Sequence, residues 1–204
     1  MSKRFSVVDA RGERPIQAVE GDDPAGDATF PNAGLAILVY QRTADIVTHP
    51  TIDRFAEIVA IEGLEDISQQ HRDLGLAATD IKETYERFAK SLIKVGKTSG
   101  ADRAVGLAFE LVVETDVYKL PANADIPVRV LLAGKPIANV LVKAFNRADP
   151  ASPRTTRSNA EGRVLLADVP SGEVLVSAVT MMRAEPATGA TWTSLWASTT
   201  FKRP

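Results

Sequence analysis

The chain has 204 residues, of which 45% are hydrophobic and 25% charged, and its formal net charge is −2. This composition is typical of a folded domain with its own core. A nucleic-acid-binding surface needs Lys and Arg well in excess of Asp and Glu, so we expect no nucleic-acid partner. Without cysteine, the chain has no disulfides, thiolate nucleophiles or thiolate metal ligands. No run of about eighteen apolar residues occurs and the first residues carry no apolar signal core, so we expect neither a transmembrane segment nor an export signal here.

The beginning of the chain is expected to be mostly strand. Residues 4–10 predict one strand, and residues 35–40 form a continuous apolar run that is typical of a strand buried on both faces. Between them, residues 20–28 include the sequence GDDPAGD. These acidic residues lack the ligand spacing of an EF-hand calcium loop, so we interpret the segment as a solvated turn rather than a cation site.

Two helices are predicted between residues 51 and 94. Thr51 can cap the first, whose apolar positions recur at helical spacing, and Gly63 can end it. The second would begin at Asp80. Its apolar stripe is Ile81, Tyr85, Phe88, Ala89 and Leu92, with Glu83–Arg87 and Glu86–Lys90 as surface ion pairs four residues apart. Residues 96–103 are polar and predict a boundary between an N-terminal region, 1–95, and a C-terminal one, 104–204.

The C-terminal region reads as successive short strands. Val140, Val142 and Ala144 alternate with Leu141, Lys143 and Phe145, which is the period of a strand. Turns are expected at residues 158–162 and 170–172, and further strands at 109–113, 127–132, 163–166, 173–179 and 192–201. The order strands, helices, strands favours a β-rich α+β protein whose second half is an antiparallel β-sandwich with a short helical insertion before it.

No catalytic motif is present. The chain lacks Gly-x-Ser-x-Gly, His-Glu-x-x-His, a phosphate-binding loop and the dinucleotide glycine pattern. Glu110 and Glu114 would share one face of a strand, but the alternation predicts a polar surface there rather than a cleft. We therefore expect a protein that is not an enzyme.

The two histidines, His49 and His71, are candidate metal ligands because nickel accepts nitrogen and oxygen donors. Glu62, Asp66 and Asp73 lie near His71 in the sequence and could add carboxylate oxygens. The favoured interpretation of each histidine is nevertheless an exposed surface side chain.

Trp192 and Trp196 are candidate ligand-binding residues, because side chains four positions apart share a face in a strand or a helix. If exposed, they could stack on a flat ligand such as a sugar, but packing in the core is the favoured interpretation. Tyr85, Arg87 and Lys90 could form an anion clamp. Here too the favoured interpretation is solvated charge.

Several segments follow one another between Gly34 and Phe201: EIVAIEGLEDI, YERFAKSLIKVG, GLAFELVVETD, VRVLLAGKPIANVLVKAF, SNAEGRVLLADVPSGEVLVSAV and TWTSLWASTTF. In this order and spacing they resemble a bacterial periplasmic family, domain of unknown function 4198, associated with nickel and cobalt uptake. The resemblance implies an exported protein with a transthyretin-like or carboxypeptidase-regulatory-like sandwich in its second half. It also implies nickel or cobalt in the full-length protein. Family members begin with a signal peptide and a histidine-bearing first strand, which this chain does not show, so we carry over no metal ligand.

These observations predict a non-enzymatic extracytoplasmic binding or accessory protein linked to transition-metal uptake, with a membrane uptake system or another cell-envelope protein as its partner. The alternative is a structural or interaction module that binds a protein or a polysaccharide through strand edges and loops. A hydrolase built from distant carboxylates is a third hypothesis. Binding of nickel or cobalt to the folded state would raise its stability, which separates the first hypothesis from the second.

Overall fold

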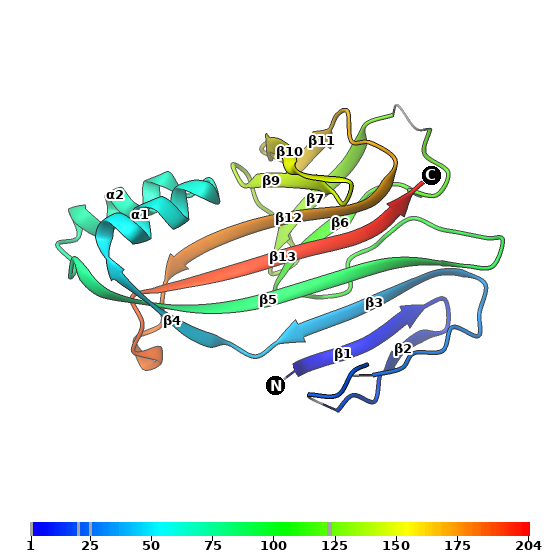
Figure 1. Ribbon diagram of the computed structural model, residues 1–204, viewed down its shortest axis with the longest axis horizontal. Coiled ribbons are helices and arrows are strands. Elements are labelled where there is room, and N and C mark those ends of the chain that lie inside the picture. Colours follow the sequence, from blue (N-terminus) through cyan, green and yellow to red (C-terminus); the bar gives the residue numbers. More distant parts are fainter. Residues whose placement is uncertain (1, 20, 25, 122–123) are drawn as a thin grey trace.

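The computed structural model describes residues 2–19, 21–24, 26–121 and 124–204, which form two β-sheets and two short helices (Figure 1). Glu20 and Ala25, which belong to the expected solvated turn, lie outside the described residues. The elements in chain order are β1 (Ser2–Asp9), β2 (Gly12–Pro15), β3 (Gly34–Arg42), β4 (Asp45–Thr51), α1 (Ile52–Ile61), α2 (Glu65–Asp73), β5 (Thr79–Val95), β6 (Phe109–Val113), β7 (Ile126–Leu132), β8 (Lys135–Pro136), β9 (Leu141–Asn146), β10 (Asp149–Arg157), β11 (Arg163–Leu166), β12 (Gly172–Arg183), the 3-10 turn η1 (Pro186–Thr188) and β13 (Trp192–Arg203).

The large sheet has the strand order β10-β9-β12-β13-β5-β3-β1-β2, with β4 paired to the first part of β5. Strands from both ends of the chain meet in it, because β13 pairs with β5 in parallel over residues 192–200 and 83–91. The other pairings in this sheet are antiparallel. The long strands β5, β12 and β13 run side by side and form its centre (Figure 1).

The small sheet, β11-β7-β6 with β8 beside β7, packs on one face of the large sheet, which we call the inner face. Side chains from both sheets fill the space between them, including Ile37, Phe88 and Val176 from the large sheet and Phe109 and Val128 from the small one. The protein is therefore β-rich and sandwich-like, as the sequence predicts.

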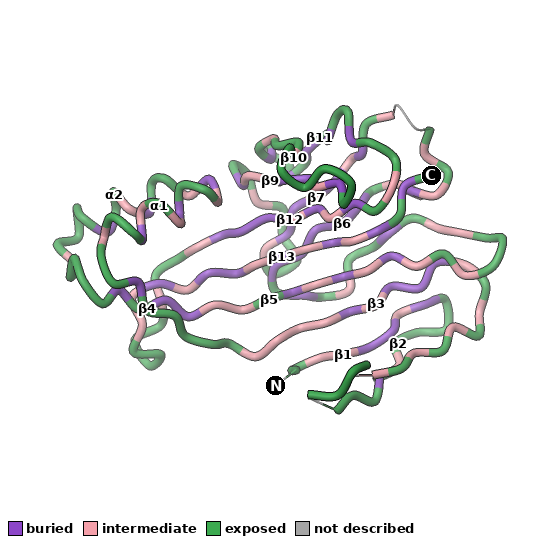
Figure 2. Tube along the Cα trace, viewed as in Figure 1, coloured by how far each residue is buried: buried purple, intermediate pink, exposed green. Residues whose placement is uncertain are grey.

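The opposite, outer face of the large sheet is covered only in part. Helices α1 and α2 cover one end, where Phe55, Val59 and Ile67 pack against Ile81 and Trp192. Ile16, Ala28 and Phe30, which lie between β2 and β3 in the chain, cover the region over β1 and β3 in a second cluster. Between these covers, exposed and half-buried residues follow the long strands (Figure 2).

Helix α1 follows the prediction. The Thr51 side chain accepts a hydrogen bond from the backbone N–H of Arg54 at 3.2 Å, and Gly63 lies just after the helix with φ of 73°. Helix α2, over Glu65–Asp73, is an element that the sequence analysis does not predict.

The predicted second helix from Asp80 is wrong, because this segment is the 17-residue strand β5. Residues 81, 85 and 89 fall on one face at the spacing of a helix, but positions four apart also share one face of a strand. Strand β5 pairs with β13 on one side and with β3 and β4 on the other, and both its faces carry buried residues. Its alternation of apolar and polar residues is therefore weak, since one face is buried and the other is partly covered.

The predicted turn at residues 158–162 connects β10 to β11, and Gly162 has the positive φ of 69° that it requires. The two strands do not pair, since β10 belongs to the large sheet and β11 to the small one. The Ser158 hydroxyl donates to the carbonyl of Ile137 and accepts from the backbone N–H of Val140, which holds the crossing in place. This turn therefore carries the chain from one layer of the sandwich to the other.

Candidate functional site

The four residues that the sequence analysis selects, His49, His71, Trp192 and Trp196, come from β4, α2 and β13 and lie at the helix-covered end of the large sheet. The ring of Phe55 joins three of them. Its centroid lies 5.2 Å from that of His49, 5.7 Å from that of His71 and 6.4 Å from that of Trp192. The fold thus gathers residues that are more than a hundred positions apart in the chain.

His71 is a structural residue of this end. Trp192 Nε1 donates to His71 Nδ1 at 3.0 Å, and His71 Nε2 lies 2.8 Å from the carbonyl oxygen of Ala77. An indole N–H can only donate, so Nδ1 carries no proton and Nε2 donates to the carbonyl. The interpretation of His71 as an exposed side chain is wrong, because it is 1% exposed. Core packing of Trp192 is confirmed.

His49 is buried as well, which also corrects its interpretation as a surface side chain. Its Nε2 lies 2.7 Å from Glu83 Oε2, and the other oxygen of Glu83 accepts a hydrogen bond from the Ser194 hydroxyl. Ser194 in turn accepts from Trp196 Nε1 at 2.9 Å. A hydrogen-bond chain therefore runs Trp196, Ser194, Glu83, His49 across three neighbouring strands, with Glu83 as its shared acceptor.

A small hollow of about 390 Å³ opens beside this chain, lined by His49, Glu83, Tyr85, Arg87 and Trp196 among others. The Ser194 hydroxyl bonds Glu83 rather than an imidazole, so it is not arranged as an activated nucleophile. The described residues contain no group of three His, Asp or Glu side chains that could hold a metal ion. They therefore do not fit a nickel or cobalt centre.

The anion clamp of Tyr85, Arg87 and Lys90 does not form. The Arg87 guanidinium lies 5.4 Å from the Tyr85 ring centroid on the outer face. Lys90 points to the inner face, because it pairs in register with Thr199 and Val39, and it is buried rather than solvated. The correction follows from the change of element, since a strand sends residues 87 and 90 to opposite faces.

An apolar cleft of about 530 Å³ lies farther along the outer face. Its floor is built by the adjacent strands β9, β12, β13 and β5 through Phe145, Leu175, Thr200 and Ser91, which follow one another in register. We call this surface the apolar cleft. The Ser91 and Thr200 hydroxyls bond each other at 2.5 Å, so the floor presents little unpaired polarity.

The rim of the apolar cleft is charged. Arg147 forms an ion pair with Glu173 at 2.6 Å, and Lys202 lies beside Glu173 in the pairing of β13 with β12. Arg147 lowers the pKa of Glu173, as does Lys202 more weakly, so Glu173 is held in its charged form. Two cations and one anion thus surround the opening.

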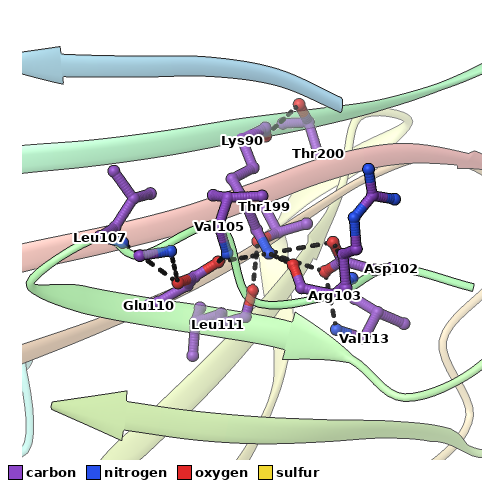
Figure 3. A network of polar contacts seen from close by, with 11 residues as sticks. Lys90, Asp102, Arg103, Val105, Leu107, Glu110, Leu111, Val113, Thr199 and Thr200 are labelled. Carbon is purple, nitrogen blue, oxygen red and sulfur yellow. Dashed lines mark hydrogen bonds and ion pairs between the residues drawn. The ribbon is translucent and has the colours of Figure 1, made fainter. Parts of the chain in front are cut away.

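A second polar cluster lies inside the sandwich, where Lys90 from the inner face of β5 meets Asp102 and Glu110 (Figure 3). Lys90 Nζ lies 3.0 and 2.9 Å from the two oxygens of Asp102 and 3.0 Å from Glu110 Oε1, and it also donates to the carbonyl of Arg103. We call these three residues the buried Lys–Asp–Glu cluster. The side chains of all three are at most 2% exposed.

Backbone N–H groups satisfy the remaining oxygens of the cluster. Asp102 accepts from Val113 and Arg103, while Glu110 accepts from Val105, Gly106 and Leu107. Burial raises the pKa of Asp102, against the opposing effects of Lys90 and the two backbone donors.

The interpretation of Glu110 as a surface residue is wrong, because the segment before β6 wraps over it and supplies the three amides. Glu114 lies just beyond β6 and bonds Arg129 and Arg163 at 2.8 and 2.9 Å.

Sequence reasoning misses this cluster. The pattern of β5 places Lys90 in a surface ion pair with Glu86, and no motif marks Asp102, which lies in the loop before β6. A charged residue within an otherwise apolar stretch, such as Glu110 between Phe109 and Leu111, is the one local signal that points to a buried polar group. Its partners are visible only in the folded chain.

The fold and these sites define a β-sandwich protein with a two-helix cover on one sheet, an open apolar cleft and a buried charge cluster. The chain belongs to the family described as domain of unknown function DUF4198, whose model matches residues 1–181. The tryptophan-containing ending at residues 192–201 lies beyond the matched range. No curated protein and no solved structure gives a significant match to the chain. In the described part of the chain, no helix is long and apolar enough to cross a membrane.

Proposed function

We propose that this protein is a non-enzymatic extracytoplasmic binding or accessory protein and that it binds its ligand in the apolar cleft. The observation that carries the proposal is the cleft itself, whose volume of about 530 Å³ lies in the range of small-molecule sites. The outer face is covered at the helical end and over β1 and β3 but not here. The proposed ligand would therefore cover an apolar part of the sheet that neither of these covers reaches.

The charges of the rim favour a particular ligand chemistry. Arg147 and Glu173 balance each other as an ion pair, and Lys202 adds a positive charge at the same opening. A molecule with an apolar body and one acidic head would place its body on Phe145 and Leu175 and its head near Lys202. Burial of the apolar body supplies most of the affinity, at roughly 25 cal/mol per Å². The rim charge selects the sign of the head.

The test is a fluorescence titration with anilinonaphthalene sulfonate, which has an apolar ring system and one anionic group. We expect saturable binding to the wild-type chain and at least tenfold weaker binding to Leu175→Asp. Leu165→Asp is the matched control, because Leu165 is exposed on the small sheet away from the cleft. Equal binding to the wild type and Leu175→Asp would remove the cleft as the site. Lys202→Glu should weaken the same titration while leaving the fold intact.

The connection with nickel and cobalt uptake, and with a membrane uptake system as partner, is a further part of this proposal and is supported by the family resemblance. It is tested by thermal unfolding of the chain with and without nickel or cobalt, because an ion that binds the folded state raises Tm. A rise in Tm would support this part of the proposal, which assigns no ligand residues because the described residues hold no group of three metal-ligating side chains. Unchanged unfolding would restrict the proposal to the apolar cleft.

A further inference from the structure

We propose that the buried Lys–Asp–Glu cluster is a site of covalent self-modification, in which Lys90 Nζ and Asp102 Cγ join in an amide bond with Glu110 as the proton carrier. This bond would fasten the long central strand β5 to the loop that leads into β6 (Figure 3). No part of the reaction needs a ligand, so the inference is independent of the apolar cleft.

The first support is proximity. Lys90 Nζ lies 3.0 and 2.9 Å from the two oxygens of Asp102, so the carboxyl carbon between them lies within the near-attack range of about 3–3.5 Å. Hydrogen bonds from Val113 and Arg103 hold the carboxyl group in place. The reacting groups are therefore positioned by the fold rather than brought together by chance encounter.

The second support is the exclusion of water. The Lys90 side chain is 1% exposed and that of Asp102 is not exposed at all, and the core residues Leu111 and Val113 lie beside the cluster (Figure 3). In water, hydrolysis of an amide competes with its formation. In this interior, the water that leaves has little chance of returning to attack the bond.

The third support is the distribution of charge. One cation and two carboxyl groups share the site, so a single proton on one carboxyl makes the cluster neutral. Three backbone N–H groups donate to Glu110 and two donate to Asp102, and burial raises the pKa of Asp102. The proposal places this proton on Asp102, because a neutral carboxylic acid is the form that an amine can attack.

The reaction balances with these groups alone. The Lys90 ammonium gives one proton to the Glu110 carboxylate, 3.0 Å away, and becomes a neutral amine. Its nitrogen attacks Asp102 Cγ and forms the C–N bond. A second proton passes from this nitrogen through Glu110 to the departing Asp102 hydroxyl, the C–O bond breaks, and one water leaves. The product is a neutral secondary amide beside a protonated Glu110, and nothing is oxidised or reduced.

The product fits the hydrogen bonds already present. The single amide N–H can donate to Glu110 Oε1, and the remaining Asp102 oxygen can keep the N–H of Val113 or Arg103 as its donor. The ion pair between Lys90 and Glu110 is replaced by neutral groups, which removes the cost of keeping two charges in the core. The folded structure therefore stabilises the product as well as positioning the reactants.

The decisive measurement is the intact mass of the purified full chain under denaturing conditions. We expect the mass to be lower than the sequence mass by one water, and a sequence mass without this loss would overturn the proposal. Tryptic digestion locates the bond, because an amide at Lys90 blocks cleavage there. We expect residues 88–94, uncleaved after Lys90, to be joined to residues 98–103. Recovery of these as separate peptides would also overturn it.

Three variants and an internal control assign the roles. Lys90→Met and Asp102→Ala should each show the full mass of their own sequence. Glu110→Gln, which cannot carry the proton but retains the size of the side chain, should show the full mass or a slow loss of water. If Glu110→Gln loses water as fast as the wild type, Glu110 has no role. Lys143, which pairs with Glu62 at 2.8 Å at a more exposed position, should be cleaved normally by trypsin.

Discussion

Gly63 occupies a position where both the backbone and the packing require glycine. Its φ is 73°, in the left-handed region that disfavours residues with a Cβ, and it ends helix α1. A Cβ at this position would lie 2.6 Å from Leu141 Cβ on β9, which is closer than real contacts allow. The close approach also lets Arg157 bond the carbonyl of Gly63 and the carboxylate of Glu65. Gly63 therefore fixes the two-helix cover to the large sheet.

We expect Gly63→Ala to lower the free energy of unfolding by about 2–4 kcal/mol, because backbone strain and overpacking add. Urea denaturation measures the change. Gly75→Ala is the matched control: its φ of 62° is similar, but a Cβ there would meet no atom within 4 Å. It should cost only the strain of about 1–2 kcal/mol. Equal losses in the two variants would show that the contact with Leu141 is unimportant.

At the scale of single elements, helix α1 depends on its N-terminal cap. The helix is only 10 residues long, and the Thr51 hydroxyl satisfies one of its free N–H groups. The cap also sets where β4 ends, since Thr51 is the last residue of that strand.

We expect Thr51→Ala to lower the free energy of unfolding by about 1 kcal/mol, the usual contribution of such a cap. Thr51→Ser keeps the hydroxyl and should leave stability nearly unchanged. Chemical denaturation of both variants, with circular dichroism as the signal, makes the comparison. A loss as large in Thr51→Ser would point to the threonine methyl group instead of the cap.

Elements that carry their own signal could be predicted from the sequence. The apolar run of β3, the alternation of β9 and the capped start of α1 are each fixed by neighbouring residues. Strand β5 could not be predicted in this way. Its residue types are suited to partners on both sides and both faces, and its apolar pattern matches a helix equally well.

The candidate sites were likewise predictable only in part from the sequence. His49, His71, Trp192 and Trp196 stand out as rare residue types, and the fold does bring them to one end of the sheet. Their burial and the hydrogen-bond chain through Glu83 are tertiary properties that no local pattern contains. The same holds for the apolar cleft, whose floor takes one residue from each of four strands.

For the whole molecule, the carboxyl groups determine the response to acid. Arg14 holds the pKa of Asp9 well below its usual range, together with Asn32 and the N–H of Arg11. Arg4 and Ser6 lower the pKa of Glu13, which lies on the neighbouring strand β2. Burial alone would raise the pKa of Asp116, but Ser99, Lys119 and the N–H of Tyr118 together lower it.

A carboxyl whose pKa is lowered by folding stabilises the protein above its unfolded pKa of about 4, and this contribution is lost as the pH falls through the folded value. We therefore expect the urea midpoint to be steady from about pH 7 to pH 5 and to fall below about pH 4. Asp9→Asn removes the carboxylate that Arg14 and Asn32 stabilise. This variant should therefore be less stable at neutral pH, and its stability should fall less as the pH is lowered. A midpoint independent of pH down to about pH 2 would contradict this assignment.

Asp102, in the buried Lys–Asp–Glu cluster, has the opposite effect on the pH dependence of stability. Its pKa is raised by burial, so its favourable contribution is present below its unfolded pKa and is lost as the pH rises through the folded value. An amide bond to Lys90 would remove this titration altogether, since Asp102 would no longer have a proton to lose. The wild type should then show the acid decline of Asp9, Glu13 and Asp116 without the opposing effect. Lys90→Met restores a free, buried Asp102, so its stability relative to the wild type should fall as the pH rises above the unfolded pKa of about 4. A difference in stability between the two proteins that does not change with pH would mean that Asp102 titrates alike in both.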